Sequence, residues 1–264
     1  MSRLTITQLR QMKDSGEKIA VLTSYDASFS RILEEAGIDV ILVGDSLGMV
    51  IQGQESTLPV TVDEMVYHTQ NVVRGSGEVF VIADMPFMSY ANADQAISNA
   101  ALLMAKGGAQ MVKLEGGTVN ISIVKQLVER GIPVCGHLGL LPQSVHHIGG
   151  YRVQGRDPED AKSLVKEAKQ LAQAGAGMLV LECVPATLSK VITAAVDIPV
   201  IGIGAGIECD GQVLVLYDML GITPGKRPRF SQNFLINGKN ISTAISDYVD
   251  AVKSGKFPNE DQQY

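Results

Sequence analysis

Eight short runs rich in Val, Ile and Leu recur along the whole chain, and amphipathic segments separate most of them. The runs are almost continuously apolar, as expected for strands that are covered on both faces of a parallel sheet. Strands alternating with helices predict right-handed βα units, and eight such units close into a single (βα)8 barrel of the TIM type, an α/β fold. The runs lie at residues 19–25, 39–45, 79–84, 111–115, 133–137, 178–183, 199–204 and 212–217.

The segments between the runs have the periodicity of helices. In the fifth of them, Asp157 is a candidate N-cap, Pro158 occupies the first helical position and Gly175 marks the end. The connection IGAGIECDG before the last run is too short for a full helix, so the eighth strand has the weakest support. The helices are predicted at residues 27–36, 61–74, 92–106, 119–130, 158–174 and 185–195.

The two ends of the chain lie outside this alternation. Residues 5–15 predict a short N-terminal helix at the base of the barrel. Residues 221–240 resemble a loop, and ISTAISDYVDAVKSG predicts a final helix with Ser242 as a possible cap. The tail from about residue 255 to 264 is expected to fray.

Composition excludes several classes of protein. A length of 264 residues fits one catalytic barrel domain that spans residues 1–264. The formal charge of -6 argues against nucleic-acid binding. No stretch approaches the ~20 apolar residues that span a bilayer, and the N-terminus lacks a signal-peptide pattern. The three cysteines form no CxxC pair, which fits reduced thiols in the cytoplasm.

Six of the apolar runs end on an acid or an imidazole. A closed parallel barrel brings its strand ends to one rim, where βα-barrel enzymes carry their catalytic groups. A buried strand gains nothing from a terminal carboxylate, so this recurrence predicts a polar, metal-binding active site. The six residues are Asp26, Asp45, Asp84, Glu115, His137 and Glu182.

Three of these acids supply hard oxygen ligands, which suit Mg²⁺ better than zinc: Asp45, Asp84 and Glu115. Each acid alone could instead cap a following helix, above all Asp84, which precedes Met-Pro. Lys113 stands two residues before Glu115, so both side chains face the barrel interior. A buried lysine needs an anionic partner, and either Glu115 or a substrate carboxylate fills that role.

His137 and Glu182 are candidates for proton transfer and substrate binding. Histidine at a barrel rim acts as an acid, a base or a hydrogen-bond donor. Glu182 lies across the barrel from Asp45, and apolar neighbours disfavour the charged form of a carboxylate, which suits a general base that removes a carbon-bound proton. A metal would hold the resulting enolate oxygen. A salt-bridged structural glutamate is the alternative.

Three further segments favour a binding site at the rim. The connections SLGMVIQGQESTLPVTV and LGLLPQSVHHIGGYRVQGR are much longer than usual βα loops, and such loops act as lids or substrate walls unless they are structural insertions. The glycine-rich segment 202–206 lacks dinucleotide-motif spacing, and it predicts close approach of the backbone to a ligand.

The chain also resembles a known family, the 3-methyl-2-oxobutanoate (ketopantoate) hydroxymethyltransferases. The blocks LVGDSLGM, ADMPFMSY, MVKLEGG, IPVCGHLGLLPQSV, GGYRVQGR, LVLECVP and IPVIGIGAG carry the resemblance along nearly the whole sequence. It implies a barrel enzyme of pantothenate (coenzyme A precursor) biosynthesis, assembled as a homodecamer. Such an enzyme transfers a one-carbon unit from 5,10-methylenetetrahydrofolate to 2-oxoisovalerate, giving 2-dehydropantoate.

The resemblance also implies roles at matching positions. Asp45 and Asp84 would bind Mg²⁺, with Glu115 at the metal directly or through water. Glu182 would be the catalytic base. The implied substrate site consists of Asp45, Ser46, Asp84, Lys113 and His137, in which Ser46 and Lys113 bind the oxoacid carboxylate.

Two other readings of the residues stay open at this point. Lyases and mutases of the phosphoenolpyruvate class are barrels that also use Mg²⁺ and oxoacid enolates, and the triplet Cys135-Gly136-His137 is similar to their reactive loop, although here it lies in a strand pattern. A non-catalytic barrel that senses an oxoacid or folate is the third reading.

Overall fold

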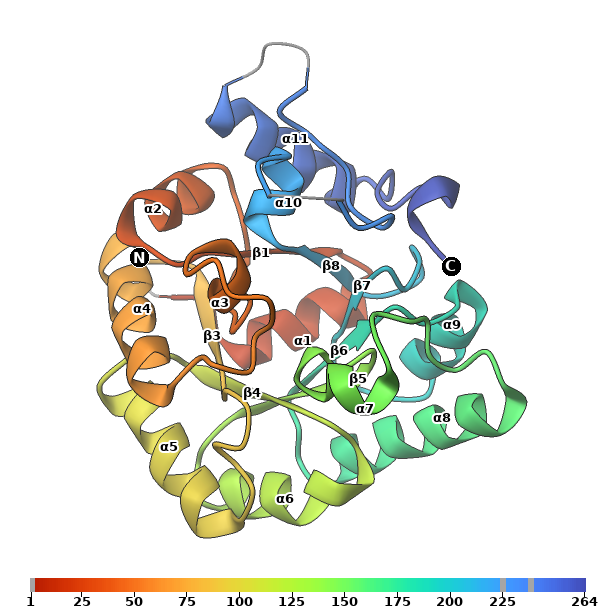
Figure 1. Cartoon of the computed structure of the whole chain (residues 1–264). Coiled ribbons are helices and arrows are strands. Elements are labelled where there is room, and N and C mark those ends of the chain that lie inside the picture. The colour runs from red at the N-terminus through yellow and green to blue at the C-terminus, as the bar shows by residue number, and fades with distance from the viewer. Residues whose placement is uncertain (1–2, 224–226, 237–239) are drawn as a thin grey trace.

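A closed barrel of eight parallel strands forms the centre of the computed structural model, which describes residues 3–223, 227–236 and 240–264. Each strand pairs with the next in chain order, and β8 pairs with β1 (Figure 1). The predicted (βα)8 barrel is therefore confirmed, including its eighth strand. The strands are β1 (Ile19–Thr23), β2 (Val40–Val43), β3 (Phe80–Asp84), β4 (Met111–Glu115), β5 (Val134–Gly139), β6 (Met178–Glu182), β7 (Val200–Ile203) and β8 (Gly211–Leu214).

An outer layer of helices covers the strands, as the amphipathic segments predicted. Asp157 caps the longest of these helices through the backbone N–H of Glu159, with Pro158 at the first position. Thr61 and Glu64 form a capping box at the start of another. The helices are α2 (Ala27–Glu35), α4 (Val62–Gly75), α5 (Ala93–Ala105), α6 (Ile121–Glu129), α8 (Pro158–Gln173) and α9 (Ala186–Ala194).

The predicted N-terminal helix, α1 (Ile6–Ser15), closes the base of the barrel. Its Lys13 ammonium donates to the Ile198 carbonyl just before β7 at 3.0 Å and pairs with Asp210 just before β8 at 2.9 Å. These contacts lie at the amino ends of the strands. The opposite rim stays open to the long βα loops, and Figure 1 shows the short helices α3 (Leu47–Val50) and α7 (Val145–Ile148) of those loops over the ring of strands.

The segment after β8 differs from expectation at two points. The run predicted as strand to residue 217 turns at Val215 into helix α10 (Leu216–Leu220), because the Leu216 N–H bonds to Thr23 Oγ1 at 2.9 Å instead of a strand partner. Helix α11 (Ile241–Lys253) is capped by Asn240 rather than by Ser242, which already lies inside the helix. Within the predicted loop 221–240, residues 224–226 and 237–239 lie outside the described part.

The C-terminal segment packs against the barrel, which differs from the expected fraying. The Phe257 ring is buried, with its centroid 5.7 Å from the centroids of Phe234 and Tyr248. A short 3-10 helix follows at Glu260–Gln262, and the Tyr264 carbonyl accepts a 2.8 Å hydrogen bond from Ala186 N at the start of α9. Burial of an aromatic ring therefore fixes a tail whose polar composition suggested disorder.

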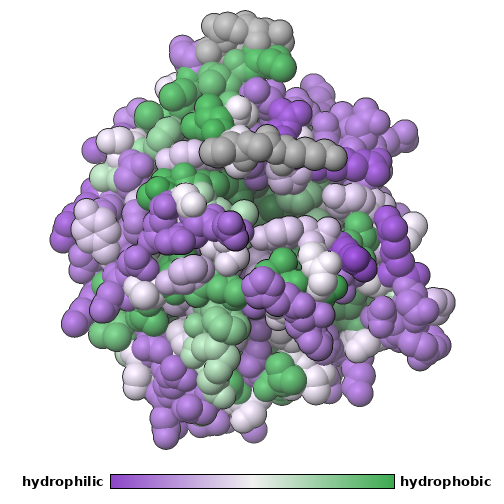
Figure 2. All heavy atoms as spheres, viewed as in Figure 1, coloured by the Kyte–Doolittle hydropathy of each residue, from purple (hydrophilic) through white to green (hydrophobic). Residues whose placement is uncertain are grey.

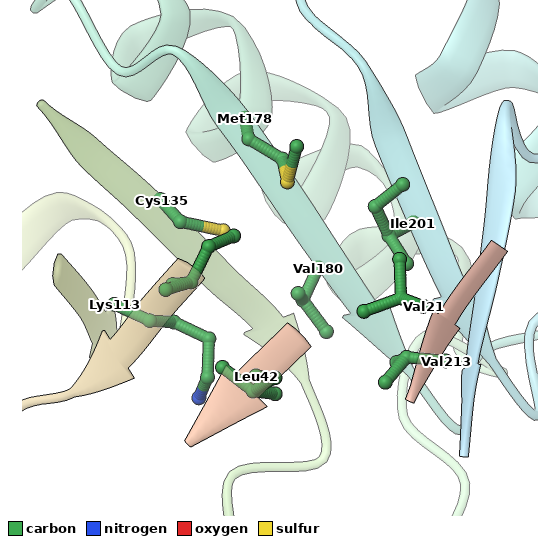
Figure 3. A pocket seen from close by; sticks show the side chains of 9 residues that line it. Val21, Leu42, Lys113, Cys135, Met178, Val180, Ile201 and Val213 are labelled. Carbon is green, nitrogen blue, oxygen red and sulfur yellow. The ribbon is translucent and has the colours of Figure 1, made fainter. Parts of the chain in front are cut away.

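Buried side chains of the eight strands fill the barrel interior. Figure 3 shows side chains from different strands converging on the axis around a cavity of about 10 Å³, which is close to the least space that holds one water molecule. Lys113 and Cys135 are the polar groups among its lining. Burial raises the pKa of the Cys135 thiol to about 12, which keeps it neutral. All three cysteines are free, as the sequence suggested, and all three are buried.

Among the residues that the structure describes, no helix combines the length and the apolar character needed to cross a bilayer.

Candidate active site

Five of the six strand-end groups meet at the carboxyl rim of the barrel. Asp84 and Glu182 end β3 and β6, Glu115 ends β4, His137 lies in β5, and Asp45 follows β2. Lys113 of β4 points into the same region. The Glu182 side chain is 13% exposed and can be reached from the mouth of the barrel. The other side chains of the group are buried, namely Asp45, Asp84, Lys113, Glu115 and His137.

Asp26 does not belong to this group. Its carboxylate caps α2, with Oδ1 accepting hydrogen bonds from the backbone N–H groups of Ser28 at 2.8 Å and Phe29 at 2.9 Å. Asp26 therefore caps a helix, and the prediction that it belongs to the active site was wrong.

Asp84 connects two neighbouring strands at the rim. Its Oδ2 accepts a 3.0 Å hydrogen bond from Asp45 N, and its Oδ1 lies 3.0 Å from Lys113 Nζ. Asp84 and Lys113 are direct register partners of β3 and β4, so sheet pairing alone brings them together. Helix capping is thus not the role of Asp84, and the ion pair of Lys113 is with Asp84 rather than with Glu115.

Asp45, Asp84 and Glu115 form an acidic cluster with more negative than positive charge. Burial raises the pKa of Asp45 well above its usual range, and the charges of Asp84 and Glu115 raise it further. Burial raises the pKa of Glu115 to about 7 against the opposing charge of Lys113. Burial alone would lower the pKa of Lys113, but the surrounding carboxylates outweigh it and raise the pKa. Three buried carboxylates thus share one ammonium.

His137 lies between this cluster and Glu182. Its Nδ1 is 3.1 Å from Lys113 Nζ, and its Nε2 is 3.2 Å from Glu182 Oε2, a close contact without the alignment of a full hydrogen bond. Burial and the neighbouring ammonium lower the pKa of His137. The neutral ring accepts from the ammonium at Nδ1, so its proton belongs on Nε2, facing the Glu182 carboxylate.

Ser46 turns toward a tyrosine that the sequence did not single out. Its hydroxyl lies 2.8 Å from the Tyr25 hydroxyl, and it makes no side-chain cap to α3. A Cβ on Gly44 would lie only 2.7 Å from Ser46 Oγ, so glycine is needed there to give the serine its position. Tyr25 is buried, and its aromatic ring gave no periodic signal to mark it as a site residue.

Gln143 and Tyr90 are the other two site residues that the sequence did not predict. Gln143 Nε2 donates to Asp45 Oδ2 at 2.8 Å, and its backbone N–H donates to Glu115 Oε2 at 3.0 Å. The Tyr90 hydroxyl donates to Gln143 Oε1 at 2.5 Å. The segment LLPQS gives only a faint signal, a proline that opens the short 3-10 turn Pro142–Ser144.

The two long loops meet over the mouth of the barrel. The Tyr151 hydroxyl of the loop after β5 lies 3.7 Å from Met49 Sδ of the loop after β2. In the same view as Figure 1, Figure 2 shows hydrophobic and hydrophilic residues interspersed over this face. The exposed apolar side chains of the loops after β2, β3 and β5 are Met49, Ile51, Phe87, Met88 and Tyr151.

The glycine-rich end of β7 has a role in packing. Gly204 has φ +61°, and a Cβ there would lie 2.9 Å from the Phe230 ring. A Cβ on Gly206 would lie 2.6 Å from the Cβ of Ala186. The backbone thus approaches the protein's own side chains closely, where the sequence predicted close approach to a ligand.

The remaining histidines stand apart from the cluster. His68 Nδ1 lies 2.7 Å from the Tyr25 carbonyl, and His146 and His147 are exposed on α7.

Sequence comparison now assigns the family. Residues 3–260 match the family described as ketopantoate hydroxymethyltransferase. The chain belongs to this family. It is 65% identical to a 3-methyl-2-oxobutanoate hydroxymethyltransferase of Nitrosococcus oceani, over 98% of each chain, and 60% identical to one of Methylobacillus flagellatus, over 97% of each chain. The resemblance stated from the sequence blocks is confirmed, and the chain is a member of an enzyme family.

Solved structures of lower sequence similarity share the barrel of this ketopantoate hydroxymethyltransferase family member. A phosphoenolpyruvate phosphomutase from Streptomyces platensis subsp. rosaceus matches with a TM-score of 0.62 at 16% identity, over 83% of each chain. A phosphonopyruvate hydrolase in complex with oxalate and Mg²⁺ matches with a TM-score of 0.61 at 12% identity, covering 80% of this chain and 81% of its own. At such identities the likeness shows the fold alone.

The donor groups at the rim fit a divalent cation. Asp84 Oδ1 is buried with the Lys113 ammonium at 3.0 Å and no aligned hydrogen bond, and the cluster has an excess of carboxylate oxygens, the ligands that Mg²⁺ prefers. In the described residues, no three side chains of His, Cys, Asp or Glu converge on one point as a ready-made chelate. Mg²⁺ is commonly held by one or two carboxylates and several waters, and Asp45 and Asp84 supply that number in this family member.

Proposed function

We propose that the chain transfers a one-carbon unit from 5,10-methylenetetrahydrofolate to 2-oxoisovalerate, giving 2-dehydropantoate for pantothenate biosynthesis. Family membership supports this reaction, because the curated relatives are 3-methyl-2-oxobutanoate hydroxymethyltransferases. The structural observation that carries it is Glu182, a carboxylate open to the mouth that faces the acidic cluster across His137. Removal of a proton from C3 of an oxoacid needs such a base opposite a site that binds the keto acid.

Asp45 and Asp84 would hold a Mg²⁺ ion, with Glu115 at the metal directly or through water. When bound, the ion would act as a Lewis acid toward the oxygens of the keto acid. The Asp45 N–H bond to Asp84 Oδ2 keeps the two acids together, which supports a shared ligand.

Lys113 and Ser46 would bind the carboxylate of the oxoacid. The raised pKa of Lys113 keeps its ammonium charged at neutral pH. The ammonium lies inside the barrel and can pair there with the anion. The Ser46 hydroxyl is held by Tyr25 at the end of the neighbouring strand and can donate toward the same anion. His137 would contact the substrate through the face of its ring that lies between Lys113 and Glu182.

Glu182 would remove the C3 proton, and the resulting enolate carbon would form a bond to the methylene carbon of the donor. Both C–N bonds of the methylene carbon, to N5 and N10 of the folate, would break, and water would supply the hydroxyl oxygen of the new hydroxymethyl group. Tetrahydrofolate would leave with two protons, the one that Glu182 removed and one from that water. The Nε2–H of His137 lies 3.2 Å from Oε2 and would steady the carboxylate once the two groups align. The loops joined at Tyr151 and Met49 would limit access of bulk water to the enolate.

Proton NMR of 2-oxoisovalerate in deuterated water tests the proposal. With enzyme and Mg²⁺ but no folate, we expect the C3 hydrogen signal to disappear, and a chelator should stop that loss. Adding 5,10-methylenetetrahydrofolate should then give 2-dehydropantoate. A C3 signal that persists even with the folate present would contradict the proposed substrate, and it would favour a barrel that binds an oxoacid without turning it over.

The lyase or mutase alternative has little support at Cys135. Its thiol lies inside the barrel below the rim, and burial raises its pKa to about 12, so it is neither mobile nor reactive. We expect Cys135→Ala to retain transferase activity. Loss of activity without loss of folding would favour the lyase class.

The proposal includes a homodecamer in the cytoplasm, without nucleic-acid or membrane partners. Three reduced, buried cysteines support a reducing compartment. Light scattering of the purified protein should give ten times the chain mass of 28.2 kDa. A smaller particle at working concentration would contradict the decamer.

A further inference from the structure

Gln143 donates hydrogen bonds to two acids of the cluster, one through its side-chain amide and one through its backbone N–H. The residue is only 6% exposed although it lies in a long loop. Its Nε2 donates both to Asp45 Oδ2 at 2.8 Å and to the Met85 carbonyl at 3.0 Å. Its backbone N–H donates to Glu115 Oε2 at 3.0 Å. A loop residue is therefore anchored to two of the candidate metal acids at once.

Tyr90 fixes the orientation of the Gln143 amide. Its hydroxyl donates to Oε1 at 2.5 Å, and the same hydroxyl accepts a 3.3 Å hydrogen bond from Glu115 N. The flipped amide would set Oε1 against Asp45 Oδ2 and the Met85 carbonyl, which are both acceptors. Only one orientation satisfies every group, so the direction of the Nε2–H bond to Asp45 is determined by the network.

Each of the two acids is held through one oxygen. Gln143 engages Oδ2 of Asp45 and Oε2 of Glu115. Asp45 Oδ1 accepts no hydrogen bond from the described residues, and Glu115 Oε1 lies 3.6 Å from His137 Nδ1. The carboxylates are thus fixed in rotation, while one oxygen of each stays available to the site.

We propose that Gln143 is a positioning residue that presets Asp45 for the divalent metal and ties closure of the loop after β5 to metal binding. This inference rests on the proposed function, because it concerns the metal of that reaction. Gln143 lies in the 3-10 turn directly before α7, so its bond to Asp45 holds the start of the loop on the rim. Residues that orient metal ligands typically change metal affinity by about 10- to 100-fold when they are replaced.

Gln143→Met isolates the amide. Methionine keeps the length and flexibility of the side chain, and the backbone N–H bond to Glu115 is retained in the variant. We expect Mn²⁺, titrated without substrate and followed by electron paramagnetic resonance, to bind about 10- to 100-fold more weakly than to the wild type. Gln154→Met is the matched control, because Gln154 lies in the same loop and its side-chain amide donates to the Arg152 carbonyl, away from the acids.

Amide hydrogen exchange provides a second measurement that does not depend on activity. In the wild type, Mn²⁺ should slow exchange at residues 141–149, because the ion would fix Asp45, whose Oδ2 accepts a hydrogen bond from Gln143 of this loop. In Gln143→Met this protection should be lost, whereas exchange in the outer helices should stay unchanged. Metal-dependent protection that persists in the variant would overturn the coupling between the loop and the metal.

Tyr90→Phe distinguishes positioning from simple packing. It removes the hydroxyl that orients the amide and leaves the ring in place, so we expect an intermediate loss of Mn²⁺ affinity. In the Gln143→Met background the same change should have little further effect. Additive losses, or Mn²⁺ affinity within about twofold of the wild type in Gln143→Met, would overturn the proposal.

Each single variant still tests the proposal if the other one fails to fold. Thermal unfolding in a chelator checks each variant, and Tyr90→Phe tests the orientation of the amide even if Gln143→Met is unstable. Wild-type protein that binds no divalent ion would overturn both this inference and the metal role in the proposed function. Wild-type binding with unchanged variants would overturn this inference alone.

Discussion

The Lys113 ammonium lies 3.0 Å from Asp84 Oδ1, and the two residues are direct neighbours in the register of β4 and β3. Both side chains are buried. The charges of Asp84, Glu115 and Asp45 outweigh burial and raise the pKa of Lys113. The lysine therefore stabilises the acidic cluster and stays charged, as the proposed binding of an anionic substrate requires.

Removal of that charge should destabilise the metal-free protein. Lys113→Met keeps the unbranched side chain but leaves Asp84 buried without its partner, which costs about 3–5 kcal/mol when one member of a buried pair is lost. We expect the free energy of unfolding in urea, measured with a chelator, to fall by that amount and to recover partly with Mg²⁺. Lys125→Met, in an exposed pair with Glu129, should change it by less than about 1 kcal/mol. Equal stability of the two variants would show that the ammonium is not needed to hold the cluster.

Glu182→Gln should abolish proton exchange at C3 of the oxoacid while leaving its binding measurable. The amide keeps the size of the side chain but is not a base, and loss of a general base typically lowers rates by about 10²- to 10⁴-fold. The rate of C3 exchange in deuterated water is the measurement, and calorimetry gives the affinity for 2-oxoisovalerate. Glu129→Gln, on the exposed face of α6, is the control. Full exchange in the Glu182 variant would exclude it as the base.

Metal binding should weaken as the pH falls through about 7. In the metal-free site, burial raises the pKa of Glu115 to about 7 and raises the pKa of Asp45 above its usual range. A metal needs the deprotonated carboxylates, so below these pKa values protons compete with it, and above them they do not. We expect Mg²⁺ affinity to rise by up to about tenfold per pH unit while one proton is released.

Calorimetry in buffers of different ionisation enthalpy measures this proton release. The release at about pH 7 should fall in Glu115→Gln, which has no proton to lose at that position. Affinity that does not change between about pH 6 and about pH 8 would mean that both acids are already ionised without the metal.

Much of the site follows from the sequence because strand ends meet at one rim. The apolar runs of β2, β3 and β4 are buried on both faces, so their period and length identify them as strands. Asp84 and Glu115 end two of these strands, and Asp45 lies two residues beyond the third. Closure of the barrel then brings the acids together without any further information.

The remaining contacts depend on the path of the chain through loops. Asp26 and Asp45 both follow apolar runs, but the extended backbone of Asp26, with φ -151° and ψ 169°, turns its carboxylate onto α2. Gln143 is 98 residues from Asp45 and lies in a loop without periodicity, so no local pattern joins them. Such partners are set by tertiary packing of the loop over the rim.

Gly204 tests whether the end of β7 needs glycine for packing or for a ligand. Gly204→Ala should destabilise by about 1–2 kcal/mol for the left-handed backbone, and by about 1–3 kcal/mol more because the Cβ would lie 2.9 Å from Phe230. Gly16→Ala is the matched control, since Gly16 has φ +76° with nothing within 4 Å of its Cβ, and it should show only the backbone cost. Urea unfolding of both variants separates the backbone cost from the cost of the contact with Phe230. Adding Phe230→Ala to Gly204→Ala should remove the cost of that contact. If Gly204→Ala is no less stable than Gly16→Ala but raises the KM for the oxoacid or the folate, the glycine serves a ligand after all.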